Sequence, residues 1–418
     1  MDDLEATIVD IGKRARTAAR TIAPVARDKK DAALRAFAAR IEATAAEILA
    51  ANAEDVARGR DKGLSAAMID RLLLDERRLA GVAKSVREIA ELADPVGELI
   101  AETKRPNGLH VRRVRVPIGV LAMIYEARPN VTAEAGALAI KSGNAIVLRG
   151  GTEARASNEA FAAAAHAALA EVGLPRDVLQ LAPPAREAIP ILLRQTDTID
   201  LAIPRGGEAL IRLVTEVARV PVVQHYKGVC HLFLDAGADA ERARTIAVDA
   251  KLSRPAVCNA LECLLVHEAD AARLLPVVLG ALASGGCEIR GCERTRAIFP
   301  AARAATPEDY GCEFLDRVIA VRVVASFEDA LAHIARYGSG HTEAIVTPSA
   351  ANAERFRREV DAACVVVNAS TRFHDGGELG LGAELGIATS RLHWRGPMGL
   401  EALTTMKWIV DGEGQIRH

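Results

Sequence analysis

The stretch VRRVRVPIGVLAMIYEARPN, residues 111–130, decides the fold of this chain. Its first half mixes valine and arginine in near alternation, which is typical of a half-exposed strand. Residues 118–125 then form a continuous apolar run, as expected of a strand that is buried on both faces of a parallel sheet. The chain before this stretch has a helical pattern, whereas the chain after it alternates strands with helices.

Upstream, residues 3–100 are predicted to be helical throughout. Apolar residues in 31–60 recur in steps of three and four, which places them on one face of a single helix. A second helix is predicted over residues 68–92, and no strand rich in valine or isoleucine interrupts the region.

Downstream, two series of strands and helices follow each other, the first ending near residue 219 and the second running over 229–370. This alternation predicts a parallel, doubly wound sheet in each series. The fold class is therefore α/β with two doubly wound domains. Residues 374–386 are rich in glycine and are expected to form an irregular loop, and the tail is expected to be a strand with a turn at Asp411–Gly412.

The composition is that of an ordinary globular protein. The 418 residues are 50% hydrophobic and 26% charged, with a formal net charge of −2. Basic and acidic side chains are interspersed, so neither nucleic acid nor a membrane surface is an expected partner. No run approaches the ~20 apolar residues that span a bilayer, and the acidic start MDDLEATIVD lacks the apolar segment of a signal peptide.

The seven cysteines have an odd count and no regular spacing, which argues against a disulfide framework. Cys287 and Cys292 are too far apart for a CxxC pair, and no second pair follows at zinc-finger spacing, so no metal site is expected. Cys263 and Cys364 lie within apolar strands and are expected to be core residues. Free cysteines of this kind fit a reducing cytoplasm.

Cys258, in the segment SRPAVCNALECLLVH, allows two interpretations. A free cysteine beside an apolar strand usually behaves as a small core residue. The alternative is a nucleophile, because Lys251 and Arg254 lie close in sequence and would lower the pKa of the thiol. Pro255 makes the approach a turn, and Asn259 adds an amide beside the thiol. The other six cysteines lack this combination.

Two turns that end in glycines have the features of a nucleotide site. In IPRGGEALI, Arg205, Gly206 and Gly207 join a strand to a helix whose N-terminus would favour a phosphate. The GxGxxG fingerprint is absent there, and a plain tight turn is the alternative. In VLRGGTEA, Arg149 ends a strand at the edge where open α/β sheets bind ligands. The alternative for Arg149 is a solvated arginine.

Asn130, in EARPNVTAEAG, follows a proline just before a predicted helix. Its side-chain amide either donates to a developing oxyanion or caps the helix. The residues by themselves leave both uses open.

Taken in this order, these stretches resemble the aldehyde dehydrogenase superfamily, and within it the branch that reduces acyl phosphates. The resemblance extends over residues 110–400, and the helical first hundred residues also fit it. The segments that carry it are YEARPNVTAEAGALAIKSGNAIVLRGG, IPRGGEALI, HYKGVCHLFLD, RPAVCNALECLLVH, YGSGHTEAIVT and VVNASTRFHDGGELGLGAELGIATSRLHWRGPMG.

The resemblance implies that Cys258 is the catalytic thiol and that Asn130 stabilises the oxyanion. Arg149 falls where the superfamily usually has a lysine on the adenosine ribose, and the small Thr152 leaves room for a 2′-phosphate, which implies NADP. Glu313 corresponds to the glutamate that holds the nicotinamide ribose. The residues expected to bind the cofactor are Arg149, Gly150, Thr152, Arg205, Gly206, Gly207 and Glu313, and those expected to bind the substrate are Arg128, Lys251, Arg254, Asn368, Thr371 and Arg372.

One departure from the superfamily bears on the reaction. Members that oxidise aldehydes carry a glutamate in the segment that corresponds here to QHYKGVCH, residues 224–231, which has no carboxylate. An enzyme that exchanges its acyl group with phosphate does not need that base to activate water.

The resemblance therefore implies NADPH-dependent reduction of L-glutamyl 5-phosphate to L-glutamate 5-semialdehyde and phosphate in proline biosynthesis, through a thioacyl intermediate on the cysteine. One alternative is a hydrolytic NAD(P)-dependent aldehyde dehydrogenase of another semialdehyde. The other is a non-catalytic relative that binds a nucleotide.

The predicted domains follow from these assignments. Residues 1–108, 123–228 and 375–395 are expected to form the cofactor-binding domain, and residues 229–374 the catalytic domain. The strands within 109–122 and 396–418 are expected to join subunits, because an isolated two-stranded hairpin is only marginally stable in water. A homo-oligomer is thus expected, and the upstream glutamate kinase is a candidate partner.

Overall fold

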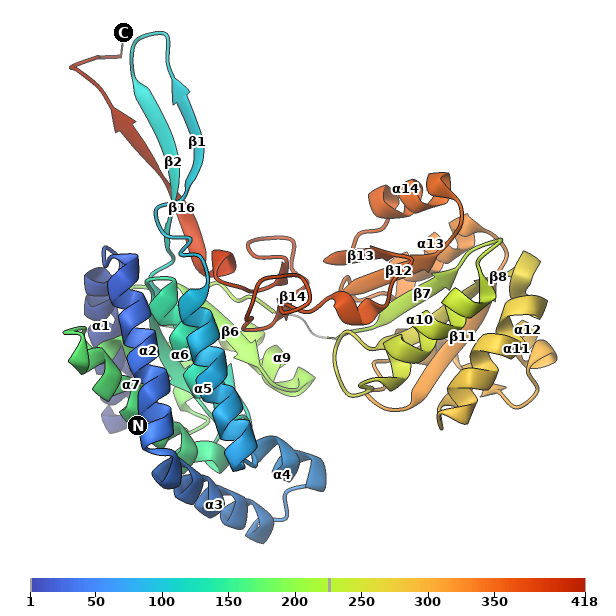
Figure 1. Cartoon of the computed structure of the whole chain (residues 1–418), viewed down its shortest axis with the longest axis horizontal. Helices are drawn as coiled ribbons and strands as arrows, with labels where there is room; N and C mark the ends of the chain where they lie inside the picture. The colour runs from blue at the N-terminus through green and yellow to red at the C-terminus, as the bar shows by residue number, and fades with distance from the viewer. Residues whose placement is uncertain (1, 225–226, 418) are drawn as a thin grey trace. The chain divides into compact units, whose positions relative to one another are not determined.

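The structure, a computed structural model, describes residues 2–224 and 227–417. The chain forms two compact units, drawn with their elements labelled in Figure 1. The first unit comprises Met1–Gln224, Leu381–Gly386 and Met398–His418, and the second comprises His225–Gly380 and Ile387–Pro397.

The glycine-rich part of the chain is divided between the units, whereas the sequence prediction assigned 375–395 to the first unit as one block. Residues 381–386 belong to the first unit, and residues 387–397 belong to the second. Ion pairs explain the second assignment, because Arg391 and Arg395 both contact the carboxylate of Asp361.

The first unit is built on a parallel sheet with the strand order β5-β4-β3-β6. Every residue of β3 and β4 is buried, so the expectation that the apolar run is covered on both faces is confirmed. Each strand ends at a loop that leads into a helix or 3-10 turn. The elements are β3 (Val120–Tyr125), α6 (Asn130–Lys141), β4 (Ala145–Arg149), α7 (Arg155–Glu171), β5 (Leu179–Leu181), α8 (Ala188–Leu193), β6 (Leu201–Arg205) and α9 (Glu208–Val217).

The predicted N-terminal helices are present but are shorter than their apolar patterns suggest. The helix predicted over 31–60 is interrupted at Thr44, whose hydroxyl donates to the carbonyl of Arg40 at 2.8 Å. The helix predicted over 68–92 is interrupted before Asp75, whose carboxylate accepts the N–H of Arg78 at 2.6 Å and caps a new helix. The helices are α1 (Asp2–Ile22), α2 (Arg27–Ala43), α3 (Ala45–Asp61), α4 (Ala66–Leu72) and α5 (Glu76–Glu91).

None of the helices in the described part of the chain combines the length and the apolar character that crossing a membrane requires.

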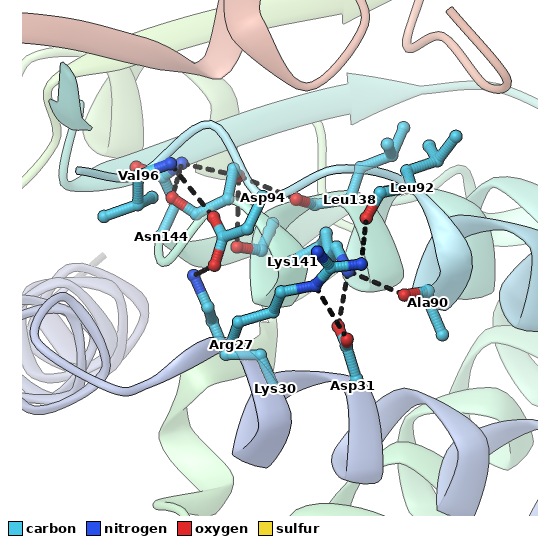
Figure 2. Close-up of polar contacts among 12 residues, drawn as sticks. Arg27, Lys30, Asp31, Ala90, Leu92, Asp94, Val96, Leu138, Lys141 and Asn144 are labelled. Carbon is cyan, nitrogen blue, oxygen red and sulfur yellow. Dashed lines mark hydrogen bonds and ion pairs between the residues drawn. The ribbon is translucent and has the colours of Figure 1, made fainter. Parts of the chain in front are cut away.

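Two fully buried lysines form ion pairs that connect α2 to α6 and to the segment that follows α5 (Figure 2). Lys141, at the end of α6, contacts the carboxylate of Asp31 on α2 and donates to the carbonyl of Ala90 on α5 at 2.6 Å. Lys30, also on α2, lies 2.6 Å from the carboxylate of Asp94, and burial lowers its pKa. Charges this deep require counter-ions, so the pairs fix the position of α2 against α5 and α6.

An antiparallel sheet of three strands extends from the first unit (Figure 1). Its central strand β2 (His110–Pro117) pairs with the tail strand β16 (Thr404–Asp411), from Pro117 opposite Thr404 to His110 opposite Asp411. The third strand, β1 (Leu99–Lys104), was not predicted, because the polar sequence LIAETK has no apolar run.

This antiparallel sheet also ends earlier than predicted. The oligomerisation strand was expected to extend to residue 122, whereas residues 120–122 belong to β3 of the parallel sheet. On β16, Met406, Trp408 and Val410 are exposed.

The second unit holds a parallel sheet with the order β10-β9-β11-β8-β7-β12-β13. One apolar layer packs beneath α10 and α11, and another packs beneath α13 and α14. The sequence missed β9, α12 and β10, which are short and rich in polar residues. The elements are β7 (Cys230–Leu234), α10 (Ala240–Leu252), β8 (Leu261–His267), α11 (Glu268–Ser284), β9 (Glu288–Gly291), α12 (Glu293–Ile298), β10 (Arg303–Ala304), β11 (Val318–Val324), α13 (Phe327–Tyr337), β12 (Thr342–Val346), α14 (Ala350–Glu359) and β13 (Cys364–Val367).

The buried pair of Asp31 and Lys141 predicts a large effect of one substitution. Asp31→Ala leaves the Lys141 ammonium buried without its carboxylate, so we expect the free energy of unfolding to fall by about 3–5 kcal/mol. Asp28→Ala, on the exposed side of the same helix, is the matched control and should change it by less than about 0.5 kcal/mol. Urea titration followed by circular dichroism measures both, and equal losses would contradict a structural role for the pair.

Candidate active site

Cys258 lies in the turn that joins α10 to β8 and is partly exposed. Cys230 and Cys263, on the neighbouring strands, are fully buried. The interpretation of Cys258 as one more packed core residue therefore does not fit its position. A partly exposed thiol at the start of a parallel strand can meet a reactant.

The backbone of Gly228 lies directly against the backbone of Cys258. A Cβ atom on residue 228 would stand 2.0 Å from the carbonyl oxygen of Cys258 and 2.8 Å from its Cα atom. Side chains do not approach backbone atoms so closely, so only glycine permits this contact. The N–H of Gly228 donates to Oε1 of Glu313 at 2.9 Å. The predicted thiol and the predicted ribose-binding glutamate are thereby joined through one glycine.

Asn259 connects the thiol turn to the segment that follows β13. Its side-chain N–H donates to the carbonyl of His374 at 3.0 Å, and its backbone carbonyl accepts the hydroxyl of Thr371 at 2.7 Å. The guanidinium of Arg372 donates to the side-chain oxygen of Asn259. Thr371 and Arg372, which were predicted to bind substrate, are therefore brought to the residue next to Cys258.

A second set of polar side chains supports the same turn, and the sequence did not indicate it. The thiol of Cys230 donates to the carbonyl of Cys258 at 3.3 Å. The hydroxyl of Thr342 lies 2.7 Å from Nδ1 of His341 and 2.8 Å from Nδ1 of His374. Burial lowers the pKa of His374 to about 4, so its ring is neutral at pH 7. The segments KGVCH and GSGHTEA contain Cys230, His341 and Thr342, which the register of β7 and β12 brings together, and His374 reaches Thr342 from the segment after β13.

Lys251 is not a surface cation, which corrects its predicted roles. Its side chain is fully buried, and Nζ lies 2.5 Å from the carboxylate of Glu262. Burial raises the pKa of Glu262 to about 7, and the lysine opposes that shift. Lys251 is thus committed to a core ion pair, whereas Arg254 is exposed.

Both the oxygen and the nitrogen of the Asn368 side-chain amide form hydrogen bonds with the backbone of Thr347. The amide oxygen accepts the N–H of Thr347 at 2.9 Å, and the amide nitrogen donates to the carbonyl of Thr347 at 3.0 Å. Asn368 also has a positive φ of 56°, which asparagine tolerates better than most residues. These contacts argue against its predicted role in substrate binding.

In the first unit, Asn130 is the first residue of α6, and the capping position is held by Pro129. The capping alternative is therefore wrong. The side-chain nitrogen of Asn130 donates to Glu134 at 3.1 Å, and burial raises the pKa of Glu134. Arg128, two residues earlier, is partly exposed.

The turn before α6 is strained and is held by a carboxylate. Ala127 has a positive φ of 40°, and its N–H donates to Glu153 at 2.7 Å. Glu153 follows Thr152, which is exposed as the 2′-phosphate prediction requires. The carboxylate thus sets the path of the chain into Asn130.

Arg149 is 93% buried at the end of β4, not solvated. One terminal nitrogen donates to the carbonyl of Pro184, and Nε has no hydrogen-bond partner among the described residues. Burial lowers the pKa of the guanidinium. At Gly150, a Cβ would stand 2.2 Å from the amide nitrogen of Asn158 and 3.1 Å from the ring of Tyr125, so the backbone there is unusually close to its neighbours.

The turn at Gly206 and Gly207 already holds an anion. The N–H of Gly207, at the start of α9, donates to a carboxylate oxygen of Glu126 at 3.2 Å. A Cβ on Gly206 would stand 2.5 Å from the same oxygen. Arg205 is partly buried beside this turn, and Gly386 of the glycine-rich loop packs against its guanidinium. The turn can therefore accept a phosphate in place of the carboxylate.

Comparison with known proteins gives consistent results. The sequence profile described as "Aldehyde dehydrogenase family" matches residues 4–284. The chain is 59% identical to a protein of Sorangium cellulosum (strain So ce56) named gamma-glutamyl phosphate reductase, over 99% of both chains. It is 54% identical to one of the same name from Xanthomonas campestris pv. campestris (strain B100), over 99% of this chain and 100% of the relative.

Solved structures agree with these relatives. The crystal structure of gamma-glutamyl phosphate reductase from Thermotoga maritima matches with a TM-score of 0.97 and 43% identity, over 98% of this chain and 100% of that one. An acetylating aldehyde dehydrogenase from Geobacillus thermoglucosidasius matches with a TM-score of 0.70 at 15% identity, which shows the shared fold.

The contact between Gly228 and Cys258 predicts a functional effect without unfolding. Gly228→Ala forces the thiol turn to move, and a displacement of about 1 Å costs roughly 10²-fold in rate. We expect kcat for turnover at Cys258 to fall by that factor while the circular dichroism spectrum is unchanged. Gly280→Ala, where a Cβ meets no atom within 4 Å, is the control. Equal activity of the two variants would show that the glycine does not constrain the thiol.

Proposed function

Because the chain belongs to the aldehyde dehydrogenase family, we propose that it catalyses the NADPH-dependent reduction of L-glutamyl 5-phosphate to L-glutamate 5-semialdehyde and phosphate, a step of proline biosynthesis. The observation that carries the proposal is the junction of Cys258, Gly228 and Glu313 in the second unit. It joins a partly exposed thiol to the glutamate that the family uses for the nicotinamide ribose.

In the proposed reaction, the Cys258 thiolate attacks the acyl carbon, and the bond from that carbon to the phosphate oxygen breaks. Phosphate leaves, and the acyl group stays on the sulfur as a thioester. The backbone N–H of Cys258 stabilises the oxyanion, and Asn130 is the second donor proposed from the family. A donor of this type contributes ~3 kcal/mol in enzymes that stabilise an oxyanion.

The residues that would hold the cofactor have suitable chemistry. Arg149 offers a buried nitrogen that has no partner among the described residues, and the N–H at the start of α9 already binds a carboxylate where a pyrophosphate would bind. NADPH, when bound, supplies the hydride that reduces the thioester carbon. We propose NADP rather than NAD because Thr152 is small and exposed, which leaves space for a 2′-phosphate.

The substrate carries two anionic groups that need cations or hydrogen-bond donors. Arg254 precedes the thiol turn in sequence. Arg372 and Thr371 both contact Asn259, the residue after Cys258. Arg128, in the first unit, is the remaining candidate from the sequence. These residues replace the wider set that the sequence suggested, since Lys251 and Asn368 serve the fold.

We also propose that subunits join through the antiparallel sheet, where Met406, Trp408 and Val410 are exposed on one strand. A homo-oligomer would cover this apolar surface. The cytoplasm is the proposed compartment, and a glutamate kinase, which makes an acyl phosphate, is the proposed source of the substrate.

The reverse reaction tests the proposal directly. Glutamate 5-semialdehyde is supplied with NADP, with and without inorganic phosphate, and the appearance of NADPH is followed by its absorbance. We expect reduction of NADP only when phosphate is present. Phosphate-independent formation of free glutamate would instead indicate the hydrolytic aldehyde dehydrogenase, and no reaction in either case would indicate a non-catalytic relative.

The nucleophile is tested by Cys258→Ala. This variant keeps the fold but has no sulfur to carry the acyl group, so we expect turnover to fall by roughly 10⁴-fold or more. NADPH binding, measured by fluorescence titration, should be largely retained. Substantial turnover in this variant would reject the assignment.

The cofactor assignment is tested by Arg149→Ala. Loss of a hydrogen bond from a charged group costs ~1.5–3 kcal/mol, so we expect KM for NADPH to rise by about 10- to 100-fold, and that for the acyl phosphate to change less. Arg194→Ala, an exposed arginine of the same unit, is the control. A larger effect on the acyl phosphate would move Arg149 to the substrate site.

A further inference from the structure

Three buried side chains of the second unit converge in the apolar layer beneath α13. They are His231 on β7, Cys263 on β8 and His333 on α13, and one ring nitrogen of each histidine and the sulfur all lie within 4.8 Å of one another. At most 2% of each residue is exposed. None of the three has a part in the proposed reaction.

The register of the sheet creates this arrangement. In the parallel ladders, His231 stands opposite Cys263 on one side and opposite Glu343 of β12 on the other. Residues that face each other in register point to the same side of a sheet. Three neighbouring strands thus present a carboxylate, an imidazole and a thiol in one row, and His333 covers the row from α13.

His231 has one ring nitrogen that is satisfied and one that is not. Its Nδ1 lies 2.9 Å from the carboxylate of Glu343, which also accepts the backbone N–H of His231. Its Nε2 is buried and has no hydrogen-bond partner in the described part of the chain. A buried polar atom without a partner costs about 1–3 kcal/mol. A histidine that is held at one nitrogen by a carboxylate and free at the other is the usual arrangement of a metal ligand.

His333 directs its own Nε2 to the same point. This nitrogen lies 3.6 Å from the sulfur of Cys263, while Nδ1 lies 3.2 Å from the guanidinium of Arg322. The ring is fixed by edge contact with Tyr310, at 5.2 Å between centroids. Arg322 donates to Nδ1 through one terminal nitrogen and contacts Asp329 at 3.4 Å through the other. Coordination of a metal by Nε2 requires Arg322 to keep only the Asp329 contact, so that Nδ1 carries the ring proton.

We propose that His231, Cys263 and His333 form a binding site for a divalent cation that prefers sulfur and nitrogen ligands, represented by Zn²⁺. Zinc bonds of ~2.0–2.1 Å to nitrogen and ~2.3 Å to sulfur separate the ligand atoms of a tetrahedral site by about 3.3–3.6 Å. The present separations need an inward shift of about 1 Å at most to reach that geometry. Coordination releases the thiol proton of Cys263 to solvent, since the thiolate is the ligand.

The charges around the row match a divalent cation. The Cys263 thiolate and the Glu343 carboxylate together neutralise Zn²⁺. Glu343 also lines a cavity of about 350 Å³ together with Glu359 and Asp361. Those two carboxylates are paired with arginines, whereas Glu343 has no lysine or arginine partner among residues 2–224 and 227–417. Glu343 can therefore offset the charge of a cation bound at His231.

Cobalt(II) provides a direct test, because it occupies zinc sites and is coloured. The full-length protein is treated with a chelator, titrated with Co²⁺ and followed by absorption. We expect one Co²⁺ per chain, with a thiolate-to-cobalt charge-transfer band and the strong visible bands of four-coordinate cobalt. Excess Zn²⁺ should remove these bands.

Three variants locate the site. Cys263→Ser should abolish the charge-transfer band, while Cys287→Ser, a buried cysteine of the same unit, should keep it. Cys258→Ser should also keep it. Loss of the band in Cys258→Ser, or its absence from the wild-type protein, would overturn the proposal.

A second measurement applies if Cys263→Ser does not fold. X-ray absorption at the zinc edge of the wild-type protein should show one sulfur and two imidazole nitrogens. A shell of oxygen and nitrogen without sulfur, or with more than one sulfur, would reject this site. Both measurements are independent of turnover, so they stand whether or not the proposed reduction is observed.

Discussion

The backbone contact between Gly228 and Cys258 is the constraint on which the active site depends. A Cβ at residue 228 would stand 2.0 Å from the Cys258 carbonyl oxygen, so the thiol turn keeps its position only while residue 228 has no side chain. The same glycine binds Glu313 through its N–H. On the other side, Asn259 binds the segment of Thr371 and His374. The thiol that we propose to attack an acyl carbon is thus held by main-chain contacts, which have little freedom to adjust.

The sequence predicted the parallel sheets well because most residues of their strands are apolar. All the residues of β3, β4, β7 and β12 are buried, and such runs are visible without any knowledge of their neighbours. The polar strands β1 and β9 were missed for the opposite reason, since their place in a sheet comes from pairing with β2 and β11. The breaks between helices were missed because a capping residue such as Asp75 leaves the apolar period almost unchanged.

In the candidate site, too, the sequence predicts features that lie within one segment but not the contacts between distant segments. Cys258 stands out in its own segment, and the glycine turns are visible from a few residues. The roles of Lys251 and Asn368 depend instead on their contacts with Glu262 and Thr347, which only the folded structure creates. A cation near a thiol in sequence is an equally good candidate for a core ion pair, and only burial distinguishes the two.

The sequence did not predict the proposed metal site because the prediction relied on the spacing of ligands along the chain. Such rules find ligands that are close in sequence, as in a zinc finger, whereas Cys263 and His333 are 70 positions apart. In a parallel sheet, neighbours across the ladder are always separated by a whole strand, crossover and strand. His231, Cys263 and Glu343 become adjacent only because their strands are in one register, and a slip of one residue would turn the shifted side chain to the opposite face. The row is therefore as well defined as the sheet itself, and its unpaired imidazole nitrogen is a property of that register.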